Sequence, residues 1–236
     1  MDIAGKPLVV WVAERARVAS TISRTIVATD DPRIVDTVSA AGFDAAITRA
    51  DHLSGTDRIA EVAHNLSADI IVNVQGDEPL IDPETIDRAV RALIDDPEAQ
   101  MATTWEPITE PGDISNPSVV KVTFDQDGYA TGFSRDAGQP NSQAKKHTGL
   151  YAYRRDFLLK FARWPASESE KRESLEQLRA LDHGVKIKVV EAASPSIGVD
   201  TAEDLERVRR MVGTHASGVP ELNGACQRHA YRYERK

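Results

Sequence analysis

The sequence has little sulfur and no long apolar run. It contains a single cysteine, Cys226, so an intrachain disulfide is excluded and the composition is typical of a protein in a reducing cytoplasm. Nothing around Cys226 would lower the pKa of its thiol, so we expect a bystander rather than a catalytic residue. There is no run of about 18 apolar residues, and the N-terminus has no basic stretch followed by an apolar one. We therefore expect neither membrane insertion nor a signal peptide.

The chain also lacks an excess of basic residues. Its 29 Lys and Arg against 37 Asp and Glu give a formal net charge of −8. Because no basic footprint extends over the whole chain, we expect no nucleic-acid partner. A protein of this charge that binds an anion needs a local basic pocket. The 41% hydrophobic and 28% charged residues are ordinary for a globular protein, and 236 residues suffice for one α/β domain.

Short apolar runs and amphipathic segments alternate through the first hundred residues. Strands are predicted at 25–28, 43–48 and 69–74, and helices at 7–19, 32–42, 56–66 and 83–94. Two of these helices begin with an Asp-Pro pair, in which the aspartate is a good N-cap and the proline suits the first helical position. This βαβα order favours a doubly wound parallel sheet.

The second half of the chain has a different pattern. Residues 119–124 and 129–134 flank an Asp-Gly turn and predict a hairpin, and 136–146 predict a polar loop. Further elements are predicted as a strand at 149–154, one helix at 169–182, a strand at 186–191 and a helix at 201–211. We expect one domain over 1–212, with 119–160 as a subregion for substrate binding and dimerisation, and an irregular tail over 213–236.

Two acidic corners are candidates for a metal site. Asp77 directly follows the most apolar strand, and Asp200 lies between an extended stretch and a helix. Ligands of open α/β sheets bind beyond the carboxyl ends of the strands, and two aspartates could jointly hold Mg²⁺ there. A plain turn at Asp77 and a helix cap at Asp200, where Thr201 could cap equally well, remain open as alternatives.

Three further segments could bind a substrate. The polar stretch 52–58 opens a helix whose free N–H groups could face an anion or a base, or it is only a helix start capped by Ser54 or Thr56. Arg135 and the cations at 145–147 suit a carboxylate, although a solvated basic face explains them too. Two polar residues of the predicted helix 169–182 could line a polyol pocket or lie on an ordinary surface; they are Glu176 and Gln177.

Together and in this order, the motifs resemble those of the 3-deoxy-manno-octulosonate (Kdo) cytidylyltransferases, also called CMP-Kdo synthetases. The resemblance spans about residues 2–212, and the blocks at 48–58 and 72–79 are its most specific parts. The motifs are Gly-Lys-Pro at 5–7, Ala-Thr-Asp at 28–30, Thr-Arg-Ala-Asp-His-x-Ser-Gly-Thr-Asp-Arg at 48–58, Val-Asn-Val-Gln-Gly-Asp-Glu-Pro at 72–79, Asn-Pro-x-x-Val-Lys-Val at 116–122, Phe-Ser-Arg at 133–135, His-x-Gly-x-Tyr-x-Tyr-Arg at 147–154, Leu-Glu-Gln-Leu-Arg at 175–179 and Gly-Val-Asp-Thr-x-Glu-Asp-Leu-Glu at 198–206.

The resemblance implies a fold, a reaction and partners. The fold is a Rossmann-like nucleotide-diphospho-sugar transferase fold with a mixed, mostly parallel sheet. In the implied reaction, CTP and Kdo give CMP-Kdo and pyrophosphate, and the product serves lipopolysaccharide biosynthesis. The implied enzyme is a cytoplasmic homodimer that uses Mg²⁺.

The resemblance also implies roles for twelve residues. Asp77 and Asp200 would be catalytic and would hold Mg²⁺. The nucleotide side would consist of Ser54, Thr56, Asp57 and Arg58. The Kdo side would consist of Gln75, Arg135, His147, Tyr151, Glu176 and Gln177. His147 is expected to form a hydrogen bond to the substrate rather than to act as a general base.

Two departures from the family pattern qualify this interpretation. The family's first strand and triphosphate loop have no counterpart here, because the chain starts at the following motif, so Lys6 is not the phosphate lysine. We therefore expect residues 1–236 to be an N-terminally incomplete domain that is nearly inactive without an upstream extension. The loop after Arg135 is also short. The rival interpretations are a cytidylyltransferase for another acidic sugar, such as 8-amino-Kdo or a sialic acid, and a non-catalytic nucleotide-binding remnant.

Overall fold

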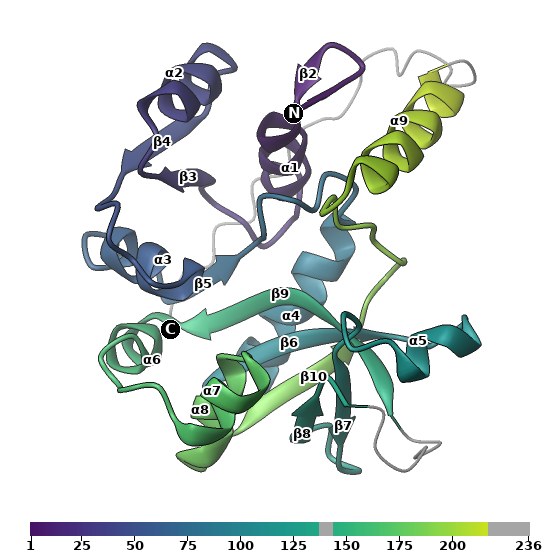
Figure 1. Cartoon of the computed structure of the whole chain (residues 1–236). Coiled ribbons are helices and arrows are strands. Elements are labelled where there is room, and N and C mark those ends of the chain that lie inside the picture. Colours follow the sequence, from purple (N-terminus) through teal and green to yellow (C-terminus); the bar gives the residue numbers. More distant parts are fainter. Residues whose placement is uncertain (137–143, 217–236) are drawn as a thin grey trace.

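The computed structural model of the chain describes residues 1–136 and 144–216, and side chains up to residue 213. Helices and strands alternate over residues 8–124, after which consecutive strands and then consecutive helices follow (Figure 1). The strands are β1 (Asp2–Ile3), β2 (Lys6–Pro7), β3 (Ile26–Thr29), β4 (Asp44–Ile47), β5 (Ile70–Asn73), β6 (Met101–Glu106), β7 (Lys121–Phe124), β8 (Ala130–Ser134), β9 (Lys145–Arg154) and β10 (Ile187–Glu191). The helices are α1 (Leu8–Arg17), α2 (Pro32–Ala40), α3 (Gly55–Ala63), α4 (Pro83–Asp95), α5 (Pro111–Ser115), α6 (Arg155–Phe161), α7 (Glu168–Glu173), α8 (Gln177–Asp182) and α9 (Ala202–Ala216). Within these residues no helix is both long and apolar enough to cross a membrane.

The largest sheet has six strands in the order β10–β6–β9–β7–β8, with β5 added on β9. The mixed α/β fold is thus confirmed, and so is the hairpin of β7 and β8. The pairing departs from a mostly parallel sheet, because among the described residues only β6–β10 and β3–β4 pair in parallel. The reason is β9, which runs antiparallel to β5, β6 and β7. In addition, β3 and β4 form a separate pair that is not hydrogen-bonded to β5.

Both faces of the large sheet are covered. Tyr153 on β9 belongs to one apolar core together with Phe161 of α6, whereas the neighbouring Ala152 belongs to a second core together with Ile86 of α4. Successive side chains of a strand point to opposite faces, so one strand contributes to both cores. A sheet buried in this way has few exposed backbone groups, which makes it a rigid base for a site.

The predicted helix starts depend on local hydrogen bonds. Asp31 and Asp82 each accept a hydrogen bond from the backbone two residues on, and a proline follows each of them. Ser54 caps α3 by accepting from the backbone of Asp57. Thr201 and Asp204 exchange hydrogen bonds at the start of α9, so the cap there is Thr201 and not Asp200.

The predicted single helix over 169–182 is wrong, because the structure contains two helices, α7 and α8. Ser174 between them has a positive φ of 54°, which a continuing right-handed helix cannot contain. Leu175 and Leu178 are buried as expected, and their burial in the core holds the chain in this bend. The break places Glu176 and Gln177 at the start of α8 instead of along a continuous helix surface.

Two segment boundaries also differ from the expectation. α9 continues to Ala216, so the helix extends into the tail that we predicted to be irregular from 213. A glycine costs a helix about 1 kcal/mol relative to alanine but does not terminate it, which is why Gly213 is no stop. The strand predicted at 149–154 starts earlier, at Lys145. The rest of the polar loop, 137–143, and the remaining tail with Cys226 lie outside the described residues.

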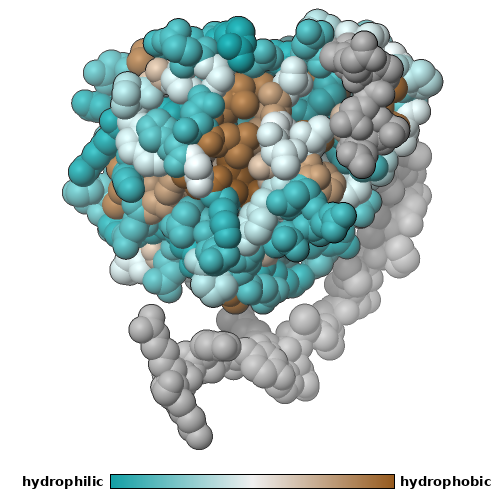
Figure 2. All heavy atoms as spheres, turned by 90° about the horizontal axis from the view of Figure 1, so that it is seen from below, coloured by the Kyte–Doolittle hydropathy of each residue, from teal (hydrophilic) through white to brown (hydrophobic). Residues whose placement is uncertain are grey.

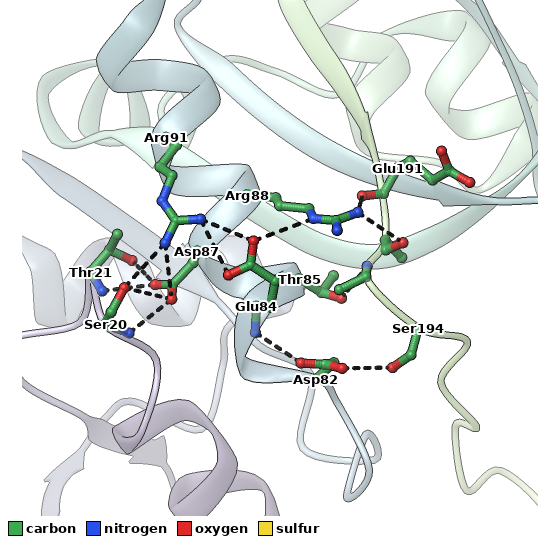
Figure 3. A network of polar contacts seen from close by, with 12 residues as sticks. Ser20, Thr21, Asp82, Glu84, Thr85, Asp87, Arg88, Arg91, Glu191 and Ser194 are labelled. Carbon is green, nitrogen blue, oxygen red and sulfur yellow. Dashed lines mark hydrogen bonds and ion pairs between the residues drawn. The ribbon is translucent and has the colours of Figure 1, made fainter. Parts of the chain in front are cut away.

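α4 is fastened to the loop after α1 by a buried carboxylate (Figure 3). Asp87 accepts hydrogen bonds from the backbone N–H and the hydroxyl of both Ser20 and Thr21, at 2.6–2.9 Å. Arg91 adds an ion pair at 3.5 Å. Burial alone would raise the pKa of the Asp87 carboxyl, but the hydrogen bonds outweigh it, so its pKa lies below the ordinary 3.8.

We predict that Asp87→Asn lowers the free energy of unfolding at neutral pH by about 1–3 kcal/mol, because an amide cannot accept all four hydrogen bonds. A lowered carboxylate pKa stabilises the fold above the unfolded value and loses that effect as the pH falls further. The difference between wild type and variant should therefore shrink below about pH 4. Urea unfolding at several pH values measures it, with the exposed Asp95→Asn on the same helix as control. Equal stability at pH 7 would contradict the prediction.

Candidate functional site

A cavity of about 330 Å³ opens between β9, the start of α3 and the break between α7 and α8. Its wall includes all six residues predicted for the sugar side and one predicted for the nucleotide side, Thr56. The lining residues are Gly55, Thr56, Asn73, Gln75, Ser118, Val120, Arg135, His147, Gly149, Tyr151, Ser174, Leu175, Glu176 and Gln177. The tertiary fold thus brings together residues that are more than a hundred positions apart in the sequence.

The His-x-Gly-x-Tyr motif reaches this cavity because it lies on one strand. His147, Gly149 and Tyr151 occupy alternate positions of β9 and all line the wall. Gly149 leaves room for Gln75, since a Cβ atom at position 149 would lie 3.4 Å from the Gln75 side chain. Gln75 therefore packs directly against the strand at Gly149.

The protonation of His147 follows from its hydrogen bonds. Thr103 donates its only hydroxyl hydrogen to the Leu150 carbonyl at 2.8 Å. The Thr103 oxygen therefore accepts from Nε2–H of His147, also at 2.8 Å, which leaves Nδ1 as an acceptor. Burial lowers the pKa of His147 to about 3, so the ring is neutral near pH 7. Burial also raises the pKa of Tyr151, so its hydroxyl stays protonated.

Arg135 provides a positive charge at the cavity wall. Its guanidinium donates to the backbone carbonyls of Glu173 at 3.0 Å and Pro117 at 3.3 Å. Within residues 1–136 and 144–216, no carboxylate forms an ion pair with it. The Glu173 carboxylate lies close by, but it accepts from the Arg135 backbone N–H at 3.3 Å. A guanidinium held by backbone carbonyls suits a planar carboxylate, which it can bind through two parallel hydrogen bonds.

The start of α8 supplies further polar groups to the cavity wall. Gln177 is buried, and its amide nitrogen has no hydrogen-bond partner in the described structure. Such a buried donor is costly unless a ligand or a water pairs with it. Glu176 accepts a hydrogen bond from the Thr56 hydroxyl. Thr56 therefore faces the sugar-side residues rather than a separate nucleotide pocket.

The other residues predicted for the nucleotide side do not line this cavity. The Ser54 hydroxyl is used as the cap of α3, which was the alternative to ligand binding. Arg58 forms an ion pair with Asp30 at 3.0 Å and a hydrogen bond with Thr48. Asp57 lies in the first turn of α3. Arg58 is thus held beside Asp30, which directly follows β3.

Asp77 and Asp200 lie beside each other although 123 positions separate them. The backbone N–H of Val199 donates to the Asp77 carbonyl at 2.8 Å. Burial raises the pKa of the Asp77 carboxyl, and the negative charge of Asp200 raises it further. Neither carboxylate forms an ion pair within the described residues, and Thr201 has taken over the cap of α9. Both side chains are thus available to a cation.

Two carboxylates fit Mg²⁺ better than a metal that needs a full protein cage. Among the described residues, no group of three or more His, Cys, Asp or Glu side chains could hold a metal ion. Mg²⁺ typically takes one or two carboxylates and completes its shell with phosphates and water. The donor set of Asp77 and Asp200 therefore matches Mg²⁺ bound together with a phosphate substrate.

Four residues near the site were not found by sequence reasoning. They are Thr103, which orients His147, and Glu78, Glu106 and Ser196, which surround the Asp77 corner. Glu78 lies within the motif at 72–79, so the sequence placed it beside Asp77 without assigning it a role. Glu106 and Thr103 lie on β6, a strand that we did not predict.

The comparisons with known proteins identify the family of this chain. A family described as cytidylyltransferase matches residues 1–187. This chain belongs to the cytidylyltransferase family. It is 51% identical over 228 residues to a 3-deoxy-manno-octulosonate cytidylyltransferase of Pseudomonas fluorescens, with 89% of each chain covered. A protein of the same name from Pelobacter propionicus is 50% identical over 223 residues, with 88% of each chain covered. The predicted resemblance is thereby confirmed.

Solved structures are similar to the structure of this chain as well. A CMP:2-keto-3-deoxy-manno-octonic acid synthetase solved in complex with CTP has a TM-score of 0.86 and 41% identity, with 91% of each chain covered. A 4-diphosphocytidyl-2C-methyl-D-erythritol synthase from Anaerococcus prevotii has a TM-score of 0.61 at 14% identity, covering 90% of this chain and 92% of its own. The second likeness concerns the fold alone.

We predict that His147 remains a neutral imidazole with Nε2 protonated between about pH 5 and 8, because burial disfavours the charged ring. The ¹⁵N chemical shifts of the ring nitrogens report both the charge and the tautomer. Thr103→Val, which removes the accepting oxygen, should change the tautomer populations without charging the ring. A titration of His147 with a midpoint inside this range would contradict the prediction.

Proposed function

We propose that this cytidylyltransferase transfers CMP from CTP to the anomeric hydroxyl of Kdo. The products would be CMP-Kdo for lipopolysaccharide biosynthesis and pyrophosphate. The observation that carries the proposal is the cavity wall, where Arg135, the free acceptor of His147 and the unpaired donor of Gln177 converge. These groups complement the carboxylate and hydroxyls of an acidic sugar. The relatives named above and the CTP complex support this choice. CTP is a cytoplasmic metabolite, so we propose that compartment.

The residues of this chain act mainly by positioning. Arg135 would bind the sugar carboxylate, while His147 accepts from a hydroxyl through Nδ1 and Gln177 donates through its amide. The anomeric oxygen would then attack the α-phosphorus of CTP, and the bond from that phosphorus to the bridging oxygen of pyrophosphate breaks. Asp77 and Asp200 would hold Mg²⁺, which offsets the triphosphate charge and eases loss of the hydroxyl proton. His147 needs no role as a base in this scheme.

The decisive variant is Asp77→Asn, which removes charge but almost no volume. We predict a loss of at least about a hundredfold in pyrophosphate release from CTP and Kdo, because transition-state charge is left unbalanced. The assay uses stoichiometric enzyme, both for this chain and for a version extended upstream. The exposed Asp36→Asn serves as the matched control, and circular dichroism checks the fold. Activity of Asp77→Asn near that of the wild type would refute the metal assignment.

The same assay tests the rival substrates. Kdo, 8-amino-Kdo and a sialic acid are compared at equal concentration, and faster turnover of either rival would replace Kdo in the proposal.

Arg135→Met should raise KM for the sugar while leaving KM for CTP within about twofold, since the arginine would contact only the sugar carboxylate. The absence of turnover in both versions of the chain would favour a non-catalytic nucleotide-binding protein.

We also propose a homodimer formed through residues 119–160. β7 and β8 lie at the lower edge of the molecule in Figure 1, and Figure 2 shows a hydrophobic area on the face seen from that side. On β6 and β7, Trp105 and Phe124 are only partly buried, with ring centroids 5.7 Å apart. Apolar surface of this kind commonly marks an interface.

We predict that the protein sediments as a dimer at micromolar concentration in sedimentation velocity. A monomer at that concentration would contradict the proposed dimer.

A further inference from the structure

The segment that carries Asp200 has no regular secondary structure, yet it is fastened along its length. It connects β10 to α9 and spans residues 192–201. The backbone N–H of Ala193 donates to the Thr85 hydroxyl, and the Ser194 hydroxyl donates to Asp82, both at 2.9 Å (Figure 3). These first contacts attach the segment to the start of α4.

Two carboxylates bind the next part of the segment through one residue, Ser196. The backbone N–H of Ser196 donates to Glu106 at 2.9 Å, and its hydroxyl donates to Glu78. Glu106 is 5% exposed and also pairs with Lys146 at 3.5 Å. The second oxygen of Glu78 faces Gly198, where an added Cβ would lie 3.7 Å from it. Glu78 therefore holds the segment through Ser196 and lies beside Gly198 on the way to Asp200.

These contacts connect the two chain segments that carry the candidate metal ligands. Glu78 is the neighbour of Asp77 in the sequence, and Ser196 lies four positions before Asp200. A second contact between the same two segments is the hydrogen bond from the Val199 backbone N–H to the Asp77 carbonyl. Placing the buried Glu106 and the half-buried Glu78 here costs free energy, which a turn held by apolar packing would avoid. The arrangement is therefore best explained by a need to hold the segment in one position.

We propose that Glu78, Glu106 and Ser196 are positioning residues that set the separation of the Asp77 and Asp200 carboxylates and thereby the affinity for a divalent cation. The inference rests on the proposed function, which places Mg²⁺ at these two aspartates. Partners behind metal ligands commonly change metal affinity by about 10–100-fold when they are removed. The residues act through Asp77 and Asp200, so none of them needs to touch the ion.

The test measures binding of Mn²⁺ alone to the full chain, from the loss of the free-ion electron paramagnetic resonance signal. We expect Ser196→Ala to weaken Mn²⁺ binding about tenfold, and Ser196→Thr, which keeps a hydroxyl, to restore most of it. Glu106→Ala should weaken binding more than Glu106→Gln, because the amide oxygen can still accept from Ser196. The matched control is Ser194→Ala, which removes the same atom two residues away and should leave Mn²⁺ affinity unchanged.

The outcomes separate this inference from the proposed function. Equal Mn²⁺ affinity of Ser196→Ala and the wild type would overturn the positioning role. Equal weakening by Ser194→Ala and Ser196→Ala, matched by equal losses in melting temperature, would also overturn it, because general loosening would explain both. If Asp77→Asn binds Mn²⁺ as the wild type does, the metal site of the proposed function fails instead. Should Ser196→Ala not fold, the pair of Glu106 variants gives the same decision.

Discussion

The antiparallel pairing of β9 with three other strands is the constraint on which the rest of the structure depends. This strand contributes Tyr153 to one core and Ala152 to the other, so its register determines both. A slip by one residue would exchange the faces and turn His147 and Tyr151 away from the cavity. The pairing with β6 is irregular between Thr103 and Thr104. Such irregularities re-aim side chains, and here one threonine hydroxyl contacts both His147 and the Leu150 carbonyl.

Charge is distributed unevenly in this acidic protein. The net charge of −8 would repel an anionic substrate if it acted uniformly. At the cavity, however, Arg135 is held by backbone carbonyls, so its charge remains available to a ligand. The buried Lys121 lies behind it and donates to the Arg135 carbonyl at 3.4 Å. Burial lowers the pKa of Lys121, yet hydrogen bonds to two carbonyls compensate part of that cost. Arg135 is the cation that the described cavity wall contributes, and Glu176 lines the same wall.

Carboxylates in this molecule serve different purposes according to their partners. Asp87 is surrounded by donors and stabilises the contact between α4 and the loop after α1. Glu78 and Glu106 receive their donors from the segment before Asp200, so their contacts bear on the geometry of the candidate metal site. Within the described part of the chain, Asp77 and Asp200 form no ion pair and stay available to a ligand. The difference lies in the number of nearby donors, which the residue type alone does not reveal.

The sequence by itself determined the features that depend on neighbouring residues. The caps Asp31 and Asp82 and the reciprocal pair at Thr201 could be predicted because each hydrogen bond spans two or three positions. The family and the set of residues around the cavity were predictable as well, since their motifs are specific in type, spacing and order. The alternation of apolar runs likewise indicated an α/β fold.

Only the tertiary structure decided what depends on distant partners. The break at Ser174 follows from packing of Leu175 against the core, which outweighs the local preference for a continuous helix. The contact of Thr56 with Glu176 joins residues 120 positions apart. Ser196 shows no signal in the sequence because its partners, Glu78 and Glu106, approach it only after three separate elements have packed. Contacts of this range depend on the whole fold, and no local pattern encodes them.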